Sequence, residues 1–405
     1  MTIQTSLLIS SGSASDKIGQ ERWISDRGYL VVDQDNAEWL RSGTMASTAS
    51  YPVAATLDHM KAIGLLSTNA TSIAALDAAT DGAGRFVIAY GDATNVLVST
   101  DSGVTWATVA HNAGGAVDSV CYSSTFGLWI CSGNTGGTLF ITSSQTQASV
   151  ASAWTARTGT ATVSGTAGIT RVRASGSVVV MVTATSTASV VCASRSTNGT
   201  TWTASGAFGS NGVSSTTGTR LATDGSGNWI SIGRAGNQCQ KSTDGGVTWA
   251  NLSLPTTAYG IAFGAGLFVI TNSAGKIYTS PTGSTWTDRG AIAAGGSVIT
   301  TGSSLMHDGT NFLIPAGFTG GNAIIAYSSD GISYKTRQLS VGFTTAGSFV
   351  IAGDGTKSIF ANGAAGTVIG YSANFNTADF VGITNKTSTA PTSSDGQAVI
   401  YSRVK

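Results

Sequence analysis

Acidic side chains are the residues best suited to chemistry in this chain, because glutamates and histidines are scarce. The only glutamates, Glu21 and Glu38, lie near the N-terminus, so acid–base chemistry further along would depend on aspartates. The histidines show no spacing typical of a metal site or a catalytic triad. They are His59, His111 and His307. We therefore expect no metal and no cofactor.

The cysteines indicate neither a disulfide scaffold nor a metal site, because they are few and lack ligand spacing. They are Cys121, Cys131, Cys192 and Cys239. Cys121 and Cys131 lie in apolar runs that flank a turn, so they could face each other across a hairpin. Free cysteine is more often a small buried hydrophobic side chain, and we favour that interpretation.

Many aspartates belong to a recurrent turn pattern. Residues 99–106 read STDSGVTW and residues 242–249 read STDGGVTW, with shorter versions ending at Trp202, Trp286 and Tyr334. Ser and Asp oxygens can accept backbone N–H groups, Gly supplies positive φ, and the closing ring can pack between sheets. We assign a structural role to Ser99, Asp101, Gly103, Trp106, Ser196, Asn198, Gly199, Trp202, Ser242, Asp244, Gly246, Trp249, Ser280, Gly283, Trp286, Ser328, Asp330, Gly331 and Tyr334.

The spacing of this pattern predicts the fold. Two degenerate copies end at Trp154 and Phe380, which makes seven closing aromatics that lie 37 to 48 residues apart. Each interval holds four short apolar runs separated by turn signals, which indicates a four-stranded antiparallel meander. Such sheets bury both faces when they stack radially. The prediction is an all-β, seven-bladed β-propeller of four-stranded blades over residues 70–384.

A few aspartates fall outside the recurrent turn. Asp-Gly pairs at Asp81, Asp224, Asp308 and Asp354 fit turns in the first hairpin of a blade, and Asp379 adjoins the seventh aromatic. The unassigned acids are Asp77, Asp92, Asp118 and Asp288. A glycosidase needs two carboxylates, and Asp92 and Asp288 could reach one face from predicted loops. Solvated loop acids are the simpler interpretation.

The eight-residue pattern resembles the Asp-box, or BNR repeat, of sialidases and many other propellers. The resemblance covers residues 70–384 and implies turns at the blade periphery, between the third and fourth strands. It implies a fold and not an activity. A sialidase-like mechanism also needs an arginine cluster, a tyrosine–glutamate pair and an acid, and the repeat region contains no glutamate. We therefore expect no sialidase activity.

Charge and hydropathy exclude other functions. The formal net charge is +1 and there is no run of Lys and Arg, so the chain lacks the electrostatic pattern of a nucleic-acid-binding protein. No apolar stretch is long enough to span a membrane. The N-terminus lacks the basic region and the long apolar core of a secretory signal. We expect synthesis in a cytoplasm, no nucleic acid and no membrane insertion.

Residues 1–69 form a predicted N-terminal module, since they hold 12 of the 41 charged residues. Its stretch 22–43 predicts a hairpin or small sheet, with Trp23, Tyr29 and Trp39 as a modest core. A segment this short rarely folds alone, so we expect it to dock or oligomerise. Residues 385–405 end in a predicted strand with Val399, Tyr401 and Val404, which closes the ring or returns to the N-terminal module.

The phrase WLRSGTMASTASYPVA at residues 39–54 resembles segments of bacteriophage tail-fibre and related virion proteins. That resemblance implies a virion protein, assembled in the host cytoplasm and released by lysis, whose N-terminal module contacts other tail or baseplate proteins. The alternative is an irregular N-terminal cap on a bacterial propeller. Avidity favours several copies of a weak binder, and a trimer joined through residues 1–69 is one arrangement.

Three functions fit the sequence, in this order: a non-enzymatic adhesin for a host-surface glycan or receptor, a structural decoration, collar or fibre spacer, and a polysaccharide-cleaving glycosidase. Binding groups concentrate in loops, and the loops after the second and the outer strands share one face of this fold. The ligand-binding candidates there are His111, Arg234, Asn237, Gln238, Tyr259, Asn272, Arg289 and Asn322.

Overall fold

A computed structural model gives the structure of the chain in two compact units, residues 64–375 and residues 1–63 with 376–405. The elements that it describes are all strands, and no described helix could span a membrane. The described residues are 21–24, 28–32, 38–46, 67–73, 75–103, 105–135, 139–157, 169–183, 192–208, 220–233, 238–294, 297–298, 300–301, 305–317, 323–338, 349–362, 366–373 and 397–403.

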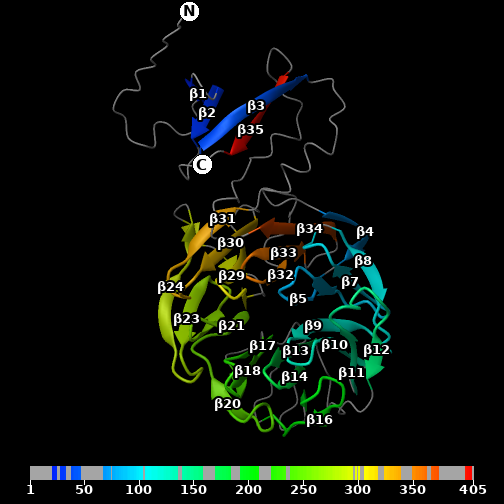
Figure 1. Cartoon of the computed structure of the whole chain (residues 1–405). Coiled ribbons are helices and arrows are strands. Elements are labelled where there is room, and N and C mark those ends of the chain that lie inside the picture. The colour runs from blue at the N-terminus through cyan, green and yellow to red at the C-terminus, as the bar shows by residue number, and fades with distance from the viewer. Residues whose placement is uncertain are drawn as a thin grey trace, which may run out of the picture. The chain divides into compact units, whose positions relative to one another are not determined.

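The larger unit is a seven-bladed β-propeller, as the spacing of the turns predicted (Figure 1). Each blade is an antiparallel meander whose first strand is innermost. Blades 1 to 3 are β5 (Asp77–Thr80), β6 (Phe86–Ala89), β7 (Asn95–Ser99), β8 (Ala107–Ala110); β9 (Val117–Ser123), β10 (Leu128–Thr135), β11 (Leu139–Thr146), β12 (Thr155–Arg157); and β13 (Thr170–Ser175), β14 (Val178–Thr183), β15 (Ala193–Ser196), β16 (Thr203–Ala204).

The remaining blades follow the same order, except that the inner edge of blade 6 consists of two short strands that both pair with β29. Blades 4 and 5 are β17 (Arg220–Thr223), β18 (Trp229–Ile232), β19 (Gln238–Ser242), β20 (Ala250–Ser253); and β21 (Gly260–Gly264), β22 (Leu267–Thr271), β23 (Lys276–Ser280), β24 (Thr287–Ala291). A small ribbon and blade 6 are β25 (Ala293–Ala294), β26 (Ser297–Val298); and β27 (Thr300–Thr301), β28 (Met306–His307), β29 (Phe312–Gly317), β30 (Ala323–Ser328), β31 (Lys335–Gln338).

Blade 7 takes its outer strand from the other end of the sequence. It contains β32 (Phe349–Gly353), β33 (Lys357–Asn362) and β34 (Gly366–Ala373), and β4 (Ser67–Ile73) pairs antiparallel with β34. The ring is therefore closed by a strand that precedes the first blade, and the predicted boundary between residues 69 and 70 falls inside that strand. The seventh predicted turn, which ends at Phe380, lies outside the described residues.

The smaller unit contains one antiparallel sheet in the order β1–β2–β3–β35, built from β1 (Glu21–Ile24), β2 (Gly28–Val32), β3 (Glu38–Ala46) and β35 (Gln397–Arg403). Of the two placements considered for the C-terminal strand, the structure has the return to the N-terminal segment, since β35 pairs with β3. The side chains of Trp23, Tyr29 and Trp39 are not described, and Val404 lies outside the described residues.

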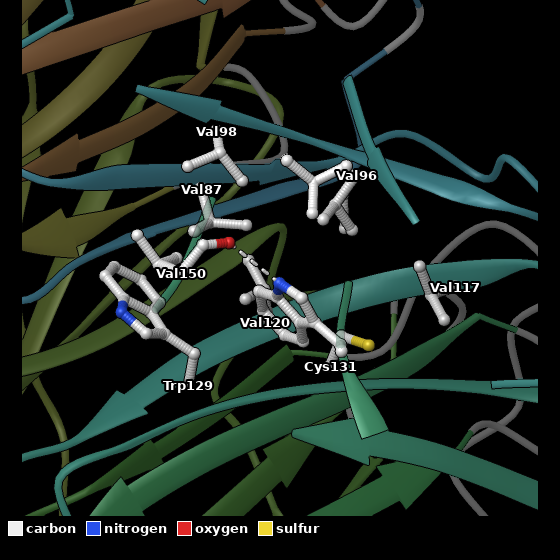
Figure 2. Packing of buried hydrophobic residues seen from close by; sticks show 11 residues of the cluster. Val87, Val96, Val98, Val117, Val120, Trp129, Cys131 and Val150 are labelled. Carbon is white, nitrogen blue, oxygen red and sulfur yellow. Dashed lines mark hydrogen bonds between the residues drawn. The ribbon is translucent and has the colours of Figure 1, made fainter. Parts of the chain in front are cut away.

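The hydrophobic cores lie between neighbouring blades, because each sheet buries both of its faces against the next. Figure 2 shows the core between blades 1 and 2, where Val87, Val96 and Val98 face Val120 and Trp129. Further buried clusters join blades 2 with 3, 3 with 4, 4 with 5, 5 with 6, and 7 with 1. Stacking of this kind needs apolar residues on both faces of a strand, which explains the near-continuous apolar runs in the sequence.

The recurrent turn joins the third and fourth strands of a blade. In blade 4, Ser242 Oγ accepts the N–H of Gly246 at 2.9 Å, while the carboxylate of Asp244 accepts the N–H and the hydroxyl of Thr248. The same bonds recur from Ser99 and Asp101 in blade 1. These side chains bind the turn's own backbone, so their role is structural.

Each turn also packs on the blade before it. A Cβ on Gly246, whose φ is +83°, would lie 2.6 Å from Cγ2 of Val180 in blade 3. A Cβ on Gly283 would lie 2.2 Å from Cδ1 of Ile230 in blade 4. The closing Trp249 is buried in the core between blades 3 and 4. The glycine therefore satisfies both a left-handed backbone and a close contact between blades.

Candidate ligand-binding cavity

The innermost strands of all seven blades surround a cavity of about 500 Å³ on the axis of the propeller, which is within the size range of ligand sites. Figure 1 shows β5, β9, β13, β17 and β21 converging on this axis. One end of the axis is the turn side, where the first-to-second-strand hairpins and the recurrent turns are found. The other end is the loop side, where the second-to-third-strand and blade-to-blade connections run.

Strand pairing gives equivalent positions in the seven blades, so the blades can be compared with one another. The last cavity-lining residue of each innermost strand lies opposite the start of the second strand, and we call these residues the rim positions. They are Thr80, Tyr122, Ala174, Thr223, Phe263, His307 and Gly353. The residue before each, which we call the inner position, is Ala79, Cys121, Arg173, Ala222, Ala262, Met306 or Ala352.

Arg173 is the exception among the inner positions, since the other six are small or apolar. Its two terminal nitrogens donate to both carboxylate oxygens of Asp77, at 2.7 and 2.9 Å. Asp77 belongs to blade 1, so this pair of a buried carboxylate and a half-buried guanidinium crosses the innermost strand of blade 2. Burial acts to raise the pKa of Asp77, but the charges of Arg173 and Arg171 outweigh it and hold that pKa below its usual value.

Arg171 lies two residues before Arg173 on the same face of β13, and its guanidinium donates hydrogen bonds to backbone carbonyl oxygens. It donates to Thr170 O at 2.7 Å, Leu76 O at 3.0 Å and Asp118 O at 3.1 Å. The side chain is 2% exposed. Both arginines thus bind blade 3 to blades 1 and 2. The cavity lining also includes Arg220, at the start of β17.

Asp118 is a second buried carboxyl group beside this cluster. Its oxygens accept the N–H of Thr170 at 3.0 Å and the hydroxyl of the same residue. Burial raises the pKa of Asp118 to about 7, against the hydrogen bonds from Thr170 and the charge of Arg171. Asp77 and Asp118 therefore titrate in opposite directions from the ordinary aspartate value.

Apart from His307 at the rim, the wall formed by blades 5 to 7 is apolar, with Ile261, Ala262, Leu305, Val350 and Ile351. Blades 1 and 3 supply the charged groups Asp77, Arg171 and Arg173. A cavity with one apolar and one hydrogen-bonding wall suits a ligand that is itself amphipathic, as ligand sites commonly are.

Three rim positions carry rings, and each ring packs on its cross-strand partner. Tyr122 lies on Trp129 with centroids 5.1 Å apart, Phe263 lies on Phe268 at 4.8 Å, and His307 lies edge-on to Phe312 at 4.7 Å. The three rim rings are half-buried. Their partners therefore hold them at the cavity edge.

The residues proposed from sequence for the loop side do not gather into a site. His111 is fully buried, and it donates from Nε2 to Asp92 O while Nδ1 accepts the N–H of Ala113. Burial lowers its pKa, against the contacts with Asp92. His111 therefore stabilises the connection between blades 1 and 2, and both of its ring nitrogens are already hydrogen-bonded.

The other loop-side candidates have varied positions. Asn272 accepts the N–H of Ala274 and Lys276, as a turn residue does. Arg289 donates to Thr279 Oγ1 from the exposed outer strand β24, and Tyr259 is half-buried at the start of blade 5. Gln238 begins β19, but its side chain is not described. Arg234, Asn237 and Asn322 lie outside the described residues.

The two loop acids considered for catalysis are also turn or surface residues. Asp92 accepts the N–H groups of Thr94 and Asn95, both at 2.7 Å. Asp288 is exposed on the outer strand and pairs with Lys276 at 3.0 Å. Neither Asp92 nor Asp288 lines the axial cavity.

Sequence reasoning missed the groups that do line the cavity, above all Asp77, Arg171, Arg173 and the ring-bearing rim positions. One signal was present, namely the two arginines of TRVR at residues 170–173 in an otherwise apolar strand. The described residues hold no group of acidic, histidine and cysteine side chains suited to a metal. All four cysteines are buried thiols, and Cys121 lies opposite Ile130 in the sheet.

Comparison with known proteins supports the fold and leaves the function open. No protein-family model and no curated protein matches the sequence. Similar solved structures include YCF48 bound to D1 peptide (TM-score 0.55, 14% identity, 78% of this chain and 97% of that one). A streptogramin B lyase (0.52, 12%, 76% and 97%) and virginiamycin B lyase from Staphylococcus aureus (0.51, 12%, 82% and 98%) are also similar. At such identities the shared property is the β-propeller.

Proposed function

We propose that the protein is a non-enzymatic bacteriophage virion protein of the tail-fibre or receptor-binding type, whose propeller binds a host-surface glycan. The observation that carries the proposal is the axial cavity, which offers hydroxyl, imidazole and aromatic groups at its rim and the Arg173–Asp77 ion pair along one wall. The resemblance of residues 39–54 to tail-fibre segments and the Asp-box resemblance of the turns supply the context.

The carboxyl groups beside the cavity favour binding over catalysis. Asp77 is held by both nitrogens of Arg173 and by Ser119, and Asp118 is held by Thr170. Both carboxyl side chains are buried. A hydrolase needs two carboxyl groups that reach the substrate. Carboxyl groups occupied in holding blades together are poor candidates for that role.

The test is to incubate the full chain with purified surface polysaccharides of candidate host bacteria and to measure both retained protein and released reducing ends. The expected result is retention without cleavage. Absence of retention on every polysaccharide would favour the alternative of a structural collar, decoration or fibre spacer. Light scattering tests homo-oligomerisation through the smaller unit. Co-purification with virions tests attachment to other tail or baseplate proteins.

Glycoside hydrolysis is the third function that the sequence fits, and one observation favours it. Asp77, with a lowered pKa, and Asp118, with a raised pKa, form the kind of contrast that separates a nucleophile from an acid. If reducing ends are released, Asp77→Asn and Asp118→Asn should each abolish the release. Release that survives both substitutions would exclude this pair.

A further inference from the structure

We propose that the turn-side rim of the cavity binds a neutral sugar residue, with Tyr122 and Phe263 as stacking rings and His307 as a hydrogen-bond donor. This inference rests on the proposed function and moves the contact from the loop side, where sequence reasoning sought it, to the turn side. It also assigns the chemical class of the ligand, an uncharged polyhydroxylated ring.

The two stacking rings lie on different sides of the axis. Tyr122 is in blade 2 and Phe263 in blade 5, and Figure 1 shows their strands β9 and β21 apart across the centre. Both are half-buried and both are supported from behind by another ring. Rigid aromatic faces with little rotamer freedom suit the C–H face of a sugar, because little entropy is lost when it binds.

His307 is presented by a specific change in the neighbouring blade. The hairpin residue after the rim is Asp or Ser in every blade except blade 5, which has Gly264. A Cβ at Gly264 would lie 2.1 Å from Cδ2 and 2.5 Å from Nε2 of His307, so the imidazole occupies the space of the missing side chain. Blade 5 therefore lacks a side chain in this hairpin, and the imidazole of His307 from blade 6 fills the space.

The protonation of His307 makes it a donor. Its Nδ1 accepts the N–H of Gly309 at 3.2 Å, so the proton of the neutral ring lies on Nε2. Burial lowers the pKa of His307, against the charge of Asp308, and so favours the neutral ring. A neutral donor binds a hydroxyl oxygen of a sugar without requiring a negative charge.

The two rim threonines and the two arginines of blade 3 also favour an uncharged ligand. Thr80 and Thr223 each accept one backbone N–H, at 3.1 and 3.2 Å, and keep their own hydroxyl proton for donation. Arg171 and Arg173 are already engaged with backbone carbonyls and with Asp77. A carboxylate ligand that recruited either arginine would have to break these buried bonds, which costs more than it gains.

The experiment titrates the full chain with single neutral sugars (glucose, galactose, mannose, rhamnose and N-acetylglucosamine) and with glucuronate, and follows the His307 imidazole and tyrosine ring resonances by NMR. We expect at least one neutral sugar to shift the His307 and Tyr122 signals, and glucuronate to bind more weakly. Shifts confined to loop-side residues, tighter binding of glucuronate, or no shift with any neutral sugar would each overturn the proposal.

Variants separate a rim site from a general effect on folding. Tyr122→Ala and Phe263→Ala should each weaken binding by about fivefold or more, whereas Tyr122→Phe keeps the ring and should bind like the parent. Gly264→Ala should displace the imidazole and weaken binding as well. The matched control is Tyr259→Ala, which removes a half-buried tyrosine from the loop side and should leave sugar binding unchanged.

The same variants distinguish failure of this inference from failure of the proposed function. If polysaccharide retains Tyr122→Ala and Phe263→Ala as well as it retains the parent, the rim is not the site, while glycan binding stands. If no polysaccharide retains the parent, the proposed function fails, whatever the single sugars do.

Discussion

The recurrent turns and the cavity-lining strands differ in how closely the seven blades agree. In the turns, blades repeat the same serine, aspartate or asparagine, glycine and aromatic ring, and each group binds the turn itself or the preceding blade. Along the axis, equivalent positions hold residues as different as Ala, Cys, Met and Arg. Repetition therefore marks what every blade needs to fold, and departure from repetition marks positions with an individual role.

The largest expected effect comes from the strongest departure, Arg173. Arg173→Ala installs the residue found at four equivalent positions but leaves Asp77 buried without its partner. Removing one member of a buried ion pair typically costs 3–5 kcal/mol, and because Arg173 is about a third exposed we expect about 3 kcal/mol. Urea unfolding at pH 7 measures the loss.

The double variant Arg173→Ala/Asp77→Ala sharpens the test. It removes both charges, so it should be more stable than Arg173→Ala alone. If the double variant is less stable than the single variant, the pair contributes through packing and not through the uncompensated charge.

Within the repeated region, glycine substitutions test whether contact between blades or backbone conformation is decisive. Gly246→Ala meets both a positive φ and Val180, and we expect a loss of about 2–3 kcal/mol. Gly82→Ala has a similar φ of +73° but nothing within 4 Å of the new Cβ, so about 1 kcal/mol is expected. Thermal unfolding of both variants gives the difference. Equal losses would show that packing on the preceding blade contributes nothing.

Asp118 gives the cavity region a pH dependence opposite in sign to that of Asp244 in the turns. Its folded pKa of about 7 lies above the unfolded value, so the folded state binds the extra proton between pH 4 and pH 7 and its stability falls as pH rises through this window. Asp118→Asn removes this decline. The free energy of unfolding of the variant, relative to that of its parent, should therefore be about 1–3 kcal/mol higher at pH 8 than at pH 4.

Burial lowers the pKa of His111 and His307, so these two histidines make the stability rise with pH near pH 6. This rise is present both in the parent protein and in Asp118→Asn. The difference between Asp118→Asn and its parent cancels this contribution. Urea unfolding from pH 4 to pH 8 measures it, and parallel profiles for the two proteins would contradict the assignment.

Most of the fold was predictable because the recurrent turn combines several local signals at one spacing. Each copy of the turn, such as Ser99–Trp106 or Ser242–Trp249, locates the third and fourth strands of one blade. The spacing of all the copies along the chain gives the number of blades. The closure of blade 7 by Ser67–Ile73 was not predictable, since a strand from residues before the first repeat carries no turn signal and only pairing with β34 identifies it.

The cavity was less predictable for a physical reason. Loop-side residues such as Asn272 and His111 are polar and follow strands, which is equally true of ligand contacts and of turn clamps. The rim residues Tyr122 and Phe263 have the sequence appearance of strand core. Their position at the axis depends on which strand is innermost, and the pairing of seven sheets establishes this.

The smallest effect is expected at the second polar position of the turn, where one blade has asparagine and another has aspartate. Asn198 in blade 3 accepts the N–H of Thr200 and Thr201 just as Asp244 in blade 4 accepts that of Thr248. Asp244→Asn should therefore cost less than about 0.5 kcal/mol at pH 7, whereas Asp244→Ala removes the acceptor and should cost about 1 kcal/mol.

Acidity separates the carboxylate from the amide in this turn. Burial acts to raise the pKa of Asp244, but hydrogen bonds led by those from Thr248 lower it to about 2. The stability from the carboxylate is therefore present above pH 4 and is lost as pH falls toward 2. Asp244→Asn should lose less stability than the parent between pH 4 and pH 2, measured by urea unfolding. Identical acid profiles would mean that the turn depends on its shape alone, and that the repeated aspartate is interchangeable with asparagine throughout the ring.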